Sequence, residues 1–173
     1  VGLVANLNNI AEHRIVEMGI TVLKRLMHRG AAGGDPETGD GAGILLALPD
    51  KFFRKSLPVT LPAKGAYGVA MLFGGAHEES RIESIVTSEG GRILFWRDVP
   101  VHPESIGAAA RKTCPLIRQI FIGGEEFKSQ AVFERKLFVM RRLIEKRLPD
   151  CYVPSCSSRS IVYKGLLLAP QID

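Results

Sequence analysis

Cysteines are few in this sequence. Its 173 residues contain three, Cys114, Cys151 and Cys156, an odd number with no paired CxxC unit. A disulfide framework, and the class of secreted proteins that depends on one, is therefore not expected. The interval from Cys151 to Cys156 lacks the second ligand pair that a zinc site needs, and no histidine lies near it. We expect buried or half-buried thiols and no metal site.

Long apolar runs are also missing, and the chain does not open like a leader peptide. Apolar stretches such as residues 43–48 and 165–169 are far shorter than the roughly 20 residues that cross a bilayer. The first five residues read Val-Gly-Leu-Val-Ala, with no positively charged segment before an apolar one. These absences predict a cytoplasmic protein without a membrane partner.

Acidic residues are in the minority, which raises a nucleic-acid hypothesis. Lys and Arg number 23 against 18 Asp and Glu, and the pI is near 9.3. However, the densest basic segment, residues 135–147, carries its cations between apolar residues at helical spacing, with Glu134 beside it and Glu145 within it. That pattern favours a solvated helix face. Three Tyr and one Trp also provide no aromatic ladder for stacking bases, so we expect no nucleic-acid partner.

What is present is the composition of an ordinary folded domain, with 46% hydrophobic and 24% charged residues. No internal repeat or charge block divides the chain, so we predict one domain of mixed α/β or α+β class over residues 1–173. Periodicity predicts helices over residues 12–27, 50–56, 77–88, 104–112 and 126–148, and strands over residues 3–5, 43–48, 67–73, 92–96, 116–122, 151–155 and 160–169. The strand over residues 43–48 should be buried on both faces, and the last two strands should form a hairpin.

One segment, residues 28–43, combines six glycines with Arg29, Asp35 and Asp40. Glycines permit positive φ and close backbone approach, which is typical of a binding loop. The alternative is a long connector in which Gly30 caps the preceding helix, Asp35 starts a turn and Arg29 pairs with Asp40. A nucleotide-binding loop does not fit, because it runs from strand to helix and this loop runs from helix to strand.

Four runs in the same order resemble the amino-terminal glutamine amidotransferase domain of the glutamate synthase large subunit. They are Val-Gly-Leu-Val-Ala at residues 1–5, the loop motifs Leu-Met-His-Arg-Gly at 26–30 and Thr-Gly-Asp-Gly-Ala-Gly at 38–43, Trp-Arg-Asp-Val-Pro at 96–100, and Ser-Ser-Arg-Ser-Ile-Val-Tyr-Lys-Gly at 157–165. The resemblance covers essentially the whole chain. Its loop motifs are also similar to those of the wider class II amidotransferases.

The resemblance implies an α+β fold, a four-layer αββα sandwich of the amino-terminal nucleophile hydrolase type, incomplete in this chain. It also implies a mechanism, in which an amino-terminal cysteine attacks the side-chain amide of glutamine with its own α-amino group as the base. Ammonia leaves a glutamyl thioester, which water hydrolyses to glutamate. In the parent enzyme the ammonia aminates 2-oxoglutarate, with electrons delivered through FMN and an iron–sulfur cluster of other domains.

The resemblance places that cysteine two residues before Val1, so no catalytic residue is assigned within residues 1–173 and the chain as given is expected to be silent. The family's oxyanion donors and its glutamine-gripping Arg and Asp match positions beyond Asp173. Arg29 with Gly30, and Asp40 with Gly41, are the expected substrate-binding or site-organising residues. Arg29 either positions the nucleophile or locks the loop by a salt bridge, and Asp40 mainly organises the glycine loop.

Partners implied by the resemblance are glutamine, the remaining domains of the synthase and either an electron-donating small subunit or ferredoxin. The competing hypothesis is a non-catalytic scaffold or interaction module that keeps the fold, and a weaker one is amidotransferase action on another acceptor. Of the other residues considered, His28 is expected to cap or pack, Trp96 to lie in the core, and Arg159 and Lys164 to be exposed.

Overall fold

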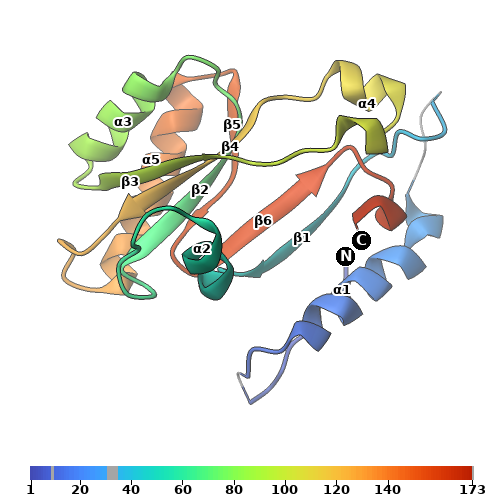
Figure 1. Ribbon diagram of the computed structural model, residues 1–173, viewed down its shortest axis with the longest axis horizontal. Helices are drawn as coiled ribbons and strands as arrows, with labels where there is room; N and C mark the ends of the chain where they lie inside the picture. Colours follow the sequence, from blue (N-terminus) through green and yellow to red (C-terminus); the bar gives the residue numbers. More distant parts are fainter. Residues whose placement is uncertain (9, 31–34, 173) are drawn as a thin grey trace. The chain divides into compact units, whose positions relative to one another are not determined.

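A computed structural model describes residues 1–8, 10–30 and 35–172 (Figure 1). The chain forms two compact units. Unit 1 consists of Val1–Leu45, His102–Cys114 and Tyr163–Asp173, and unit 2 consists of Leu46–Val101 and Pro115–Val162. The prediction of one domain over the whole chain stays a prediction.

Most predicted elements are present with shifts of a few residues at their ends. The helices are α1 (His13–Arg25), α2 (Asp50–Ser56), α3 (Glu79–Ser88), α4 (Ala108–Lys112) and α5 (Gln130–Arg147), with 3-10 turns η1 (Met27–Arg29), η2 (Pro103–Ser105) and η3 (Ala169–Ile172). The strands are β1 (Ala42–Ala47), β2 (Tyr67–Gly74), β3 (Arg92–Asp98), β4 (Ile117–Gly123), β5 (Cys151–Ser157) and β6 (Ser160–Gly165). The chain is therefore a mixture of helices and antiparallel strands, as expected.

Unit 2 contains a four-stranded sheet in the order β3-β4-β2-β5. Each neighbouring pair is antiparallel, and Val69 of β2 lies opposite Phe121 of β4 and Ser157 of β5. Because side chains alternate along a strand, the central strands β2 and β4 present one set of residues to each face of the sheet. In both strands the two sets are buried, so the core of unit 2 lies on both sides of the sheet.

One face of this sheet packs against α3 and α5 (Figure 1). Its core joins Leu72 and Ile120 of the sheet to Ile82 of α3 and to Leu137 and Met140 of α5. All five are fully buried or nearly so. This apolar interface is the reason that helical periodicity was readable in the sequence.

The opposite face carries α2, whose Phe53 packs edge-on against Phe121 with ring centroids 4.9 Å apart. Trp96 of β3 packs against the edge of the core, and its indole N–H donates to Glu83 Oε1 at 2.8 Å. This confirms the expectation that Trp96 belongs to the core. Cys151 and Cys156 are buried as expected, whereas Cys114 is exposed.

Helix α5 begins four residues later than predicted because Ser129 caps it. The Ser129 backbone is extended, and its hydroxyl accepts a hydrogen bond from the Val132 N–H at 3.3 Å. Within the helix, Glu134 accepts bonds from the Ser158 N–H at 2.9 Å and from the Ser158 hydroxyl at 2.7 Å, and it also accepts from the Ser157 hydroxyl. The expectation of a solvated face over residues 135–147 therefore holds for only part of the surface of α5.

Three strand predictions are wrong. Residues 3–5 form no strand, because no described strand pairs with them, and Leu3 is 91% exposed. Strand β1 is not buried on both faces, since it belongs to a two-stranded sheet with β6 and Leu45 is 68% exposed. The last two strands form no hairpin, because β5 pairs with β2 and β6 pairs with β1.

Two helix predictions also need correction. Helix α1 ends at Arg25, and Met27 lies in the following 3-10 turn, half exposed, rather than on the helix's apolar face. The predicted helix over residues 104–112 is broken, because Ile106 is extended and Gly107 is not helical between η2 and α4. In the described part of the chain, no helix combines the length and apolar character that a bilayer span requires.

Candidate functional site

The start of the predicted binding loop follows directly from α1. The turn η1 is followed by Gly30, whose N–H donates to the Met27 carbonyl at 3.0 Å, and the His28 ring Nδ1 lies 3.1 Å from the Arg25 carbonyl. Gly30 therefore caps the turn, and His28 has the capping role expected of it. The backbone of Arg29 lies in η1, but its side chain, like residues 31–34, lies outside the described part of the structure. The roles predicted for Arg29 stay predictions.

The structure brings together three of the four predicted site residues. A Cβ built on Gly30 would lie 3.4 Å from Asp40 Oδ1, so the Asp40 carboxylate lies close to Gly30. Asp40 is itself exposed. Next to it, Gly41 has φ +124°, a conformation that residues with a side chain rarely adopt. Gly30, Asp40 and Gly41 thus form one short surface at the entry to β1.

The centre of the loop is Asp35, for which the sequence left two roles open: a charge presented by a binding loop, or the start of a turn. That turn is present, because Asp35 Oδ1 accepts the Glu37 N–H at 3.1 Å and the Asp35 carbonyl accepts the Thr38 N–H at 3.1 Å. The other carboxylate oxygen, Oδ2, accepts the Thr38 hydroxyl at 2.8 Å and the Ala109 N–H at 3.0 Å. Asp35 therefore also binds a helix far away in the sequence.

Thr38 completes this connection to α4. Its hydroxyl oxygen accepts the Ala110 N–H at 3.3 Å, so Asp35 and Thr38 together satisfy two of the first backbone donors of α4. The N-cap position of α4 is Gly107, which has no side chain to do this itself. A Cβ on Gly107 would lie 2.5 Å from Asp35 Oδ2 and would also clash with the Thr38 hydroxyl. We call Asp35, Thr38, Gly107, Ala109 and Ala110 the loop lock.

The loop lock also perturbs the Asp35 carboxyl. Hydrogen bonds from the Ala109 N–H, the Thr38 hydroxyl and the Glu37 N–H hold the pKa of Asp35 below its usual value. The carboxylate is thus kept ionised, as the helix N-terminus of α4 favours. A signal in the sequence could have revealed this contact, because Gly-Ala-Ala-Ala at residues 107–110 begins a helix without a capping side chain.

Gln171 ties the loop to two further segments. Its Nε2 donates to the Ser105 carbonyl at 2.9 Å and to the Glu37 carbonyl at 3.4 Å. Its Oε1 accepts the Leu168 N–H at 2.6 Å. Three segments of unit 1 that are distant in sequence therefore meet around the loop.

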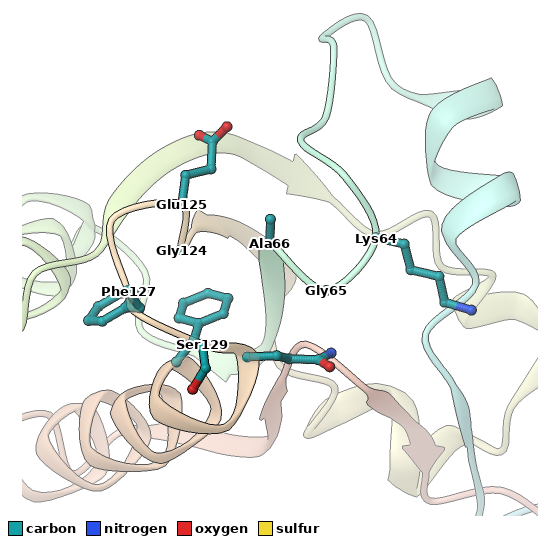
Figure 2. A pocket seen from close by; sticks show the side chains of 9 residues that line it. Lys64, Gly65, Ala66, Gly124, Glu125, Phe127 and Ser129 are labelled. Carbon is teal, nitrogen blue, oxygen red and sulfur yellow. The ribbon is translucent and has the colours of Figure 1, made fainter.

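A separate cleft lies in unit 2, at the amino end of α5 (Figure 2). Its polar residues are already in use: Glu125 pairs with Arg92 at 2.8 Å, Ser129 caps α5, and Gln130 Nε2 donates to Ser158 Oγ at 3.2 Å. Figure 2 shows the Lys64 side chain extending away from Ser129 and Phe127. Glu125, Ser129 and Gln130 are therefore already engaged in contacts within the protein.

The buried cysteines are poor nucleophiles. Burial raises the pKa of the Cys151 thiol to about 11 and that of Cys156 to about 12, so both are thiols near neutral pH. Arg159 and Lys164 are exposed, as expected. The described residues contain no group of three or more His, Cys, Asp or Glu side chains that could hold a metal ion.

Comparison with known protein families identifies the class of the chain. The model of the class-II glutamine amidotransferases matches residues 1–173, the whole length. The chain therefore belongs to the class II glutamine amidotransferases, which confirms the resemblance seen in the loop motifs.

The individual relatives are glutamate synthases. The chain is 44% identical over 185 residues to the glutamate synthase [NADPH] large chain of Bacillus subtilis (strain 168), covering 100% of this chain and 12% of that protein. It is 38% identical over 186 residues to the corresponding chain of Azospirillum brasilense, covering 99% of this chain and 12% of the relative. Ferredoxin-dependent glutamate synthase 1 (chloroplastic/mitochondrial) of Arabidopsis thaliana is 36% identical over 182 residues, covering 96% of this chain and 11% of the relative. The chain thus spans about one eighth of the length of these relatives.

Proposed function

We propose that the chain is part of the glutamine-hydrolysing domain of a glutamate synthase. The observation that carries the proposal is the family match over all 173 residues, together with similarity to glutamate synthases that use two different electron donors. The four-layer αββα sandwich belongs to the same proposal.

The proposed reaction begins with attack of a cysteine thiolate on the side-chain amide carbon of glutamine. The resemblance places this cysteine two residues before Val1. The α-amino group of the cysteine takes the thiol proton and passes it to the leaving nitrogen, so ammonia departs and a thioester forms. Water then attacks the thioester, which releases glutamate and restores the thiol. In the parent enzyme the ammonia would aminate 2-oxoglutarate, and two electrons and two protons would complete a second glutamate.

Within this chain, Arg29 and Gly30 would lie next to the nucleophile, and Asp40 and Gly41 would shape the adjoining loop. Support comes from the short distance between the Asp40 carboxylate and Gly30 and from the left-handed backbone of Gly41. A planar guanidinium at Arg29 suits a carboxylate or carbonyl partner. The exposed position of Asp40 is compatible with either loop organisation or substrate contact.

The cysteines of this chain do not fit an iron–sulfur cluster. Cys151 and Cys156 are buried and their thiol pKa values are raised, Cys114 is exposed, and the described residues contain no group of three or more His, Cys, Asp or Glu side chains that could hold a metal ion. In this proposal the cluster, the flavin and the contact with NADPH-linked or ferredoxin partners belong to the rest of the synthase.

The experiment is a glutaminase assay on the complete protein that contains these residues. We expect glutamate and ammonia in equal amounts from glutamine. Replacing Arg29 by Lys keeps the charge but removes the fork of donors, and should raise KM for glutamine about tenfold. The control is Arg25→Lys in the last turn of α1, which should leave KM unchanged. Absence of glutamine turnover in the unmodified protein would contradict the proposal and favour a scaffold role.

A further inference from the structure

Unit 1 is packed most tightly at the loop lock. Among its described residues only Gly39, Gly107 and Ala110 are buried, and two of these belong to the loop lock. Helix α1 contains no buried residue at all. The glycine loop is therefore held mainly by the polar contacts that Asp35 and Thr38 make with α4, because an apolar interior around it is lacking.

The loop lock lies next to the residues expected to meet glutamine. Gly39 directly follows Thr38 in sequence, and Asp40 and Gly41 follow in turn, so the position of Thr38 restrains this short surface. Gln171 supports the same stretch through the Glu37 carbonyl. The three bonds to the Asp35 carboxylate use both of its oxygens, which fixes its orientation as well as its distance.

We propose that Asp35 is a positioning residue for glutamine binding, which acts through Thr38 and α4 to hold Asp40 and Gly41 in place. The inference rests on the proposed function. Asp35 does not itself contact the reacting atoms. Its effect therefore falls on KM for glutamine, because the loop must be reordered on binding when the loop lock is broken.

The test compares Asp35→Asn with Glu37→Gln in the complete protein. Both variants remove one negative charge from the same turn, but the Glu37 side chain is exposed and outside the loop lock. An amide at position 35 cannot accept all three hydrogen bonds, since its NH₂ group is a donor. We expect Asp35→Asn to raise KM about tenfold with kcat within about twofold, and Glu37→Gln to change neither by more than about twofold.

A second variant covers the case in which Asp35→Asn does not fold. Thr38→Val keeps the shape of the side chain and removes the hydroxyl, and should raise KM about threefold. Hydrogen exchange at Ala109 and Ala110 should be faster in both variants than in Glu37→Gln. A merely structural role would lower the amount of active enzyme without changing KM.

The outcomes separate the two hypotheses. Equal KM values for Asp35→Asn and Glu37→Gln, in a protein that hydrolyses glutamine, would overturn the positioning role and leave the proposed function intact. A protein without glutamine turnover would overturn the proposed function and this inference with it. A selective rise in KM supports both.

Discussion

The two units of the molecule are stabilised in different ways. Unit 2 has an apolar core on both sides of its sheet, formed by fully buried residues such as Phe53, Phe121 and Leu137. Unit 1 holds its loop through a carboxylate, a hydroxyl and a side-chain amide that bind backbone groups. Apolar packing tolerates little change in volume, whereas hydrogen bonds depend on direction and protonation. The candidate site lies in unit 1, whose loop is held by hydrogen bonds.

The largest expected effect is in the core of unit 2. Leu137→Ala should reduce the free energy of opening of the β2 and β4 amides by about 3 kcal/mol, because Leu137 is fully buried and the change leaves a cavity. Hydrogen exchange of the complete protein measures this, and α1 should not respond. The matched control is Phe138→Ala on the exposed side of the same helix, with an expected change under about 0.5 kcal/mol. A similar loss in both variants would contradict a tightly packed core.

A smaller effect is expected at Gly107 in unit 1. Gly107→Ala places a Cβ against Asp35 Oδ2 and the Thr38 hydroxyl, and should cost about 2 kcal/mol of local stability. Faster exchange should appear in residues 35–43 and 108–112. As a control, Gly19→Ala in α1 meets only an ordinary contact 3.6 Å away and should stabilise the helix by about 0.5 kcal/mol or more. Unchanged exchange around Gly107 would show that the loop lock does not hold unit 1.

The two units should also differ in their response to acid. The folded pKa of Asp35 is lowered, so its contribution is complete above the usual value of 3.8 and is lost as pH falls through the folded pKa. The difference in Ala109 exchange between the unmodified protein and Asp35→Asn should therefore persist from neutral pH to about pH 5 and shrink below about pH 4. An Ala109 exchange difference that stays constant from neutral pH to below about pH 4 would contradict a loop lock that depends on the ionised Asp35 carboxylate.

The smallest effect is expected from an exposed ion pair of unit 2. Arg92 and Glu125 are 2.8 Å apart, but their side chains are 66% and 51% exposed. Glu125→Gln should change the stability of β3 by under about 0.5 kcal/mol, and added salt should reduce even that. A loss above about 1 kcal/mol would mean that polar contacts also determine the stability of unit 2.

The sequence predicted unit 2 better than unit 1, for physical reasons. Helix α2 and strand β2 were predicted to within one residue. Strand β2 was predictable because burial on both faces leaves a continuous run of apolar residues. The break at Gly107 and the late start of α5 at Ser129 were missed, since single hydrogen bonds leave no periodic signal. The β5–β6 hairpin was wrong because neighbouring strands in sequence joined different sheets, which depends on long-range pairing.

The candidate site was predictable where local motifs mark it and was missed where contacts join distant segments. Gly30, Asp40 and Gly41 were named from the motifs, and the structure places them together. Asp35 was predicted as a charge of the loop or a turn residue, but its bond to Ala109 was missed because the bond spans 74 residues that no local pattern connects. Glu134, which binds Ser157 and Ser158, was taken for part of a solvated face for the same reason.

The most direct test of the account is hydrogen exchange of the complete protein with and without saturating glutamate, the product of the proposed hydrolysis. We predict protection in peptides that cover residues 27–30 and 39–43, together with Ala109 and Ala110 of the loop lock. Peptides from β2 and β4 should be unchanged. Protection confined to the unit 2 cleft around Lys64 and Gln130, or no protection in the loop, would contradict the placement of the glutamine site in unit 1.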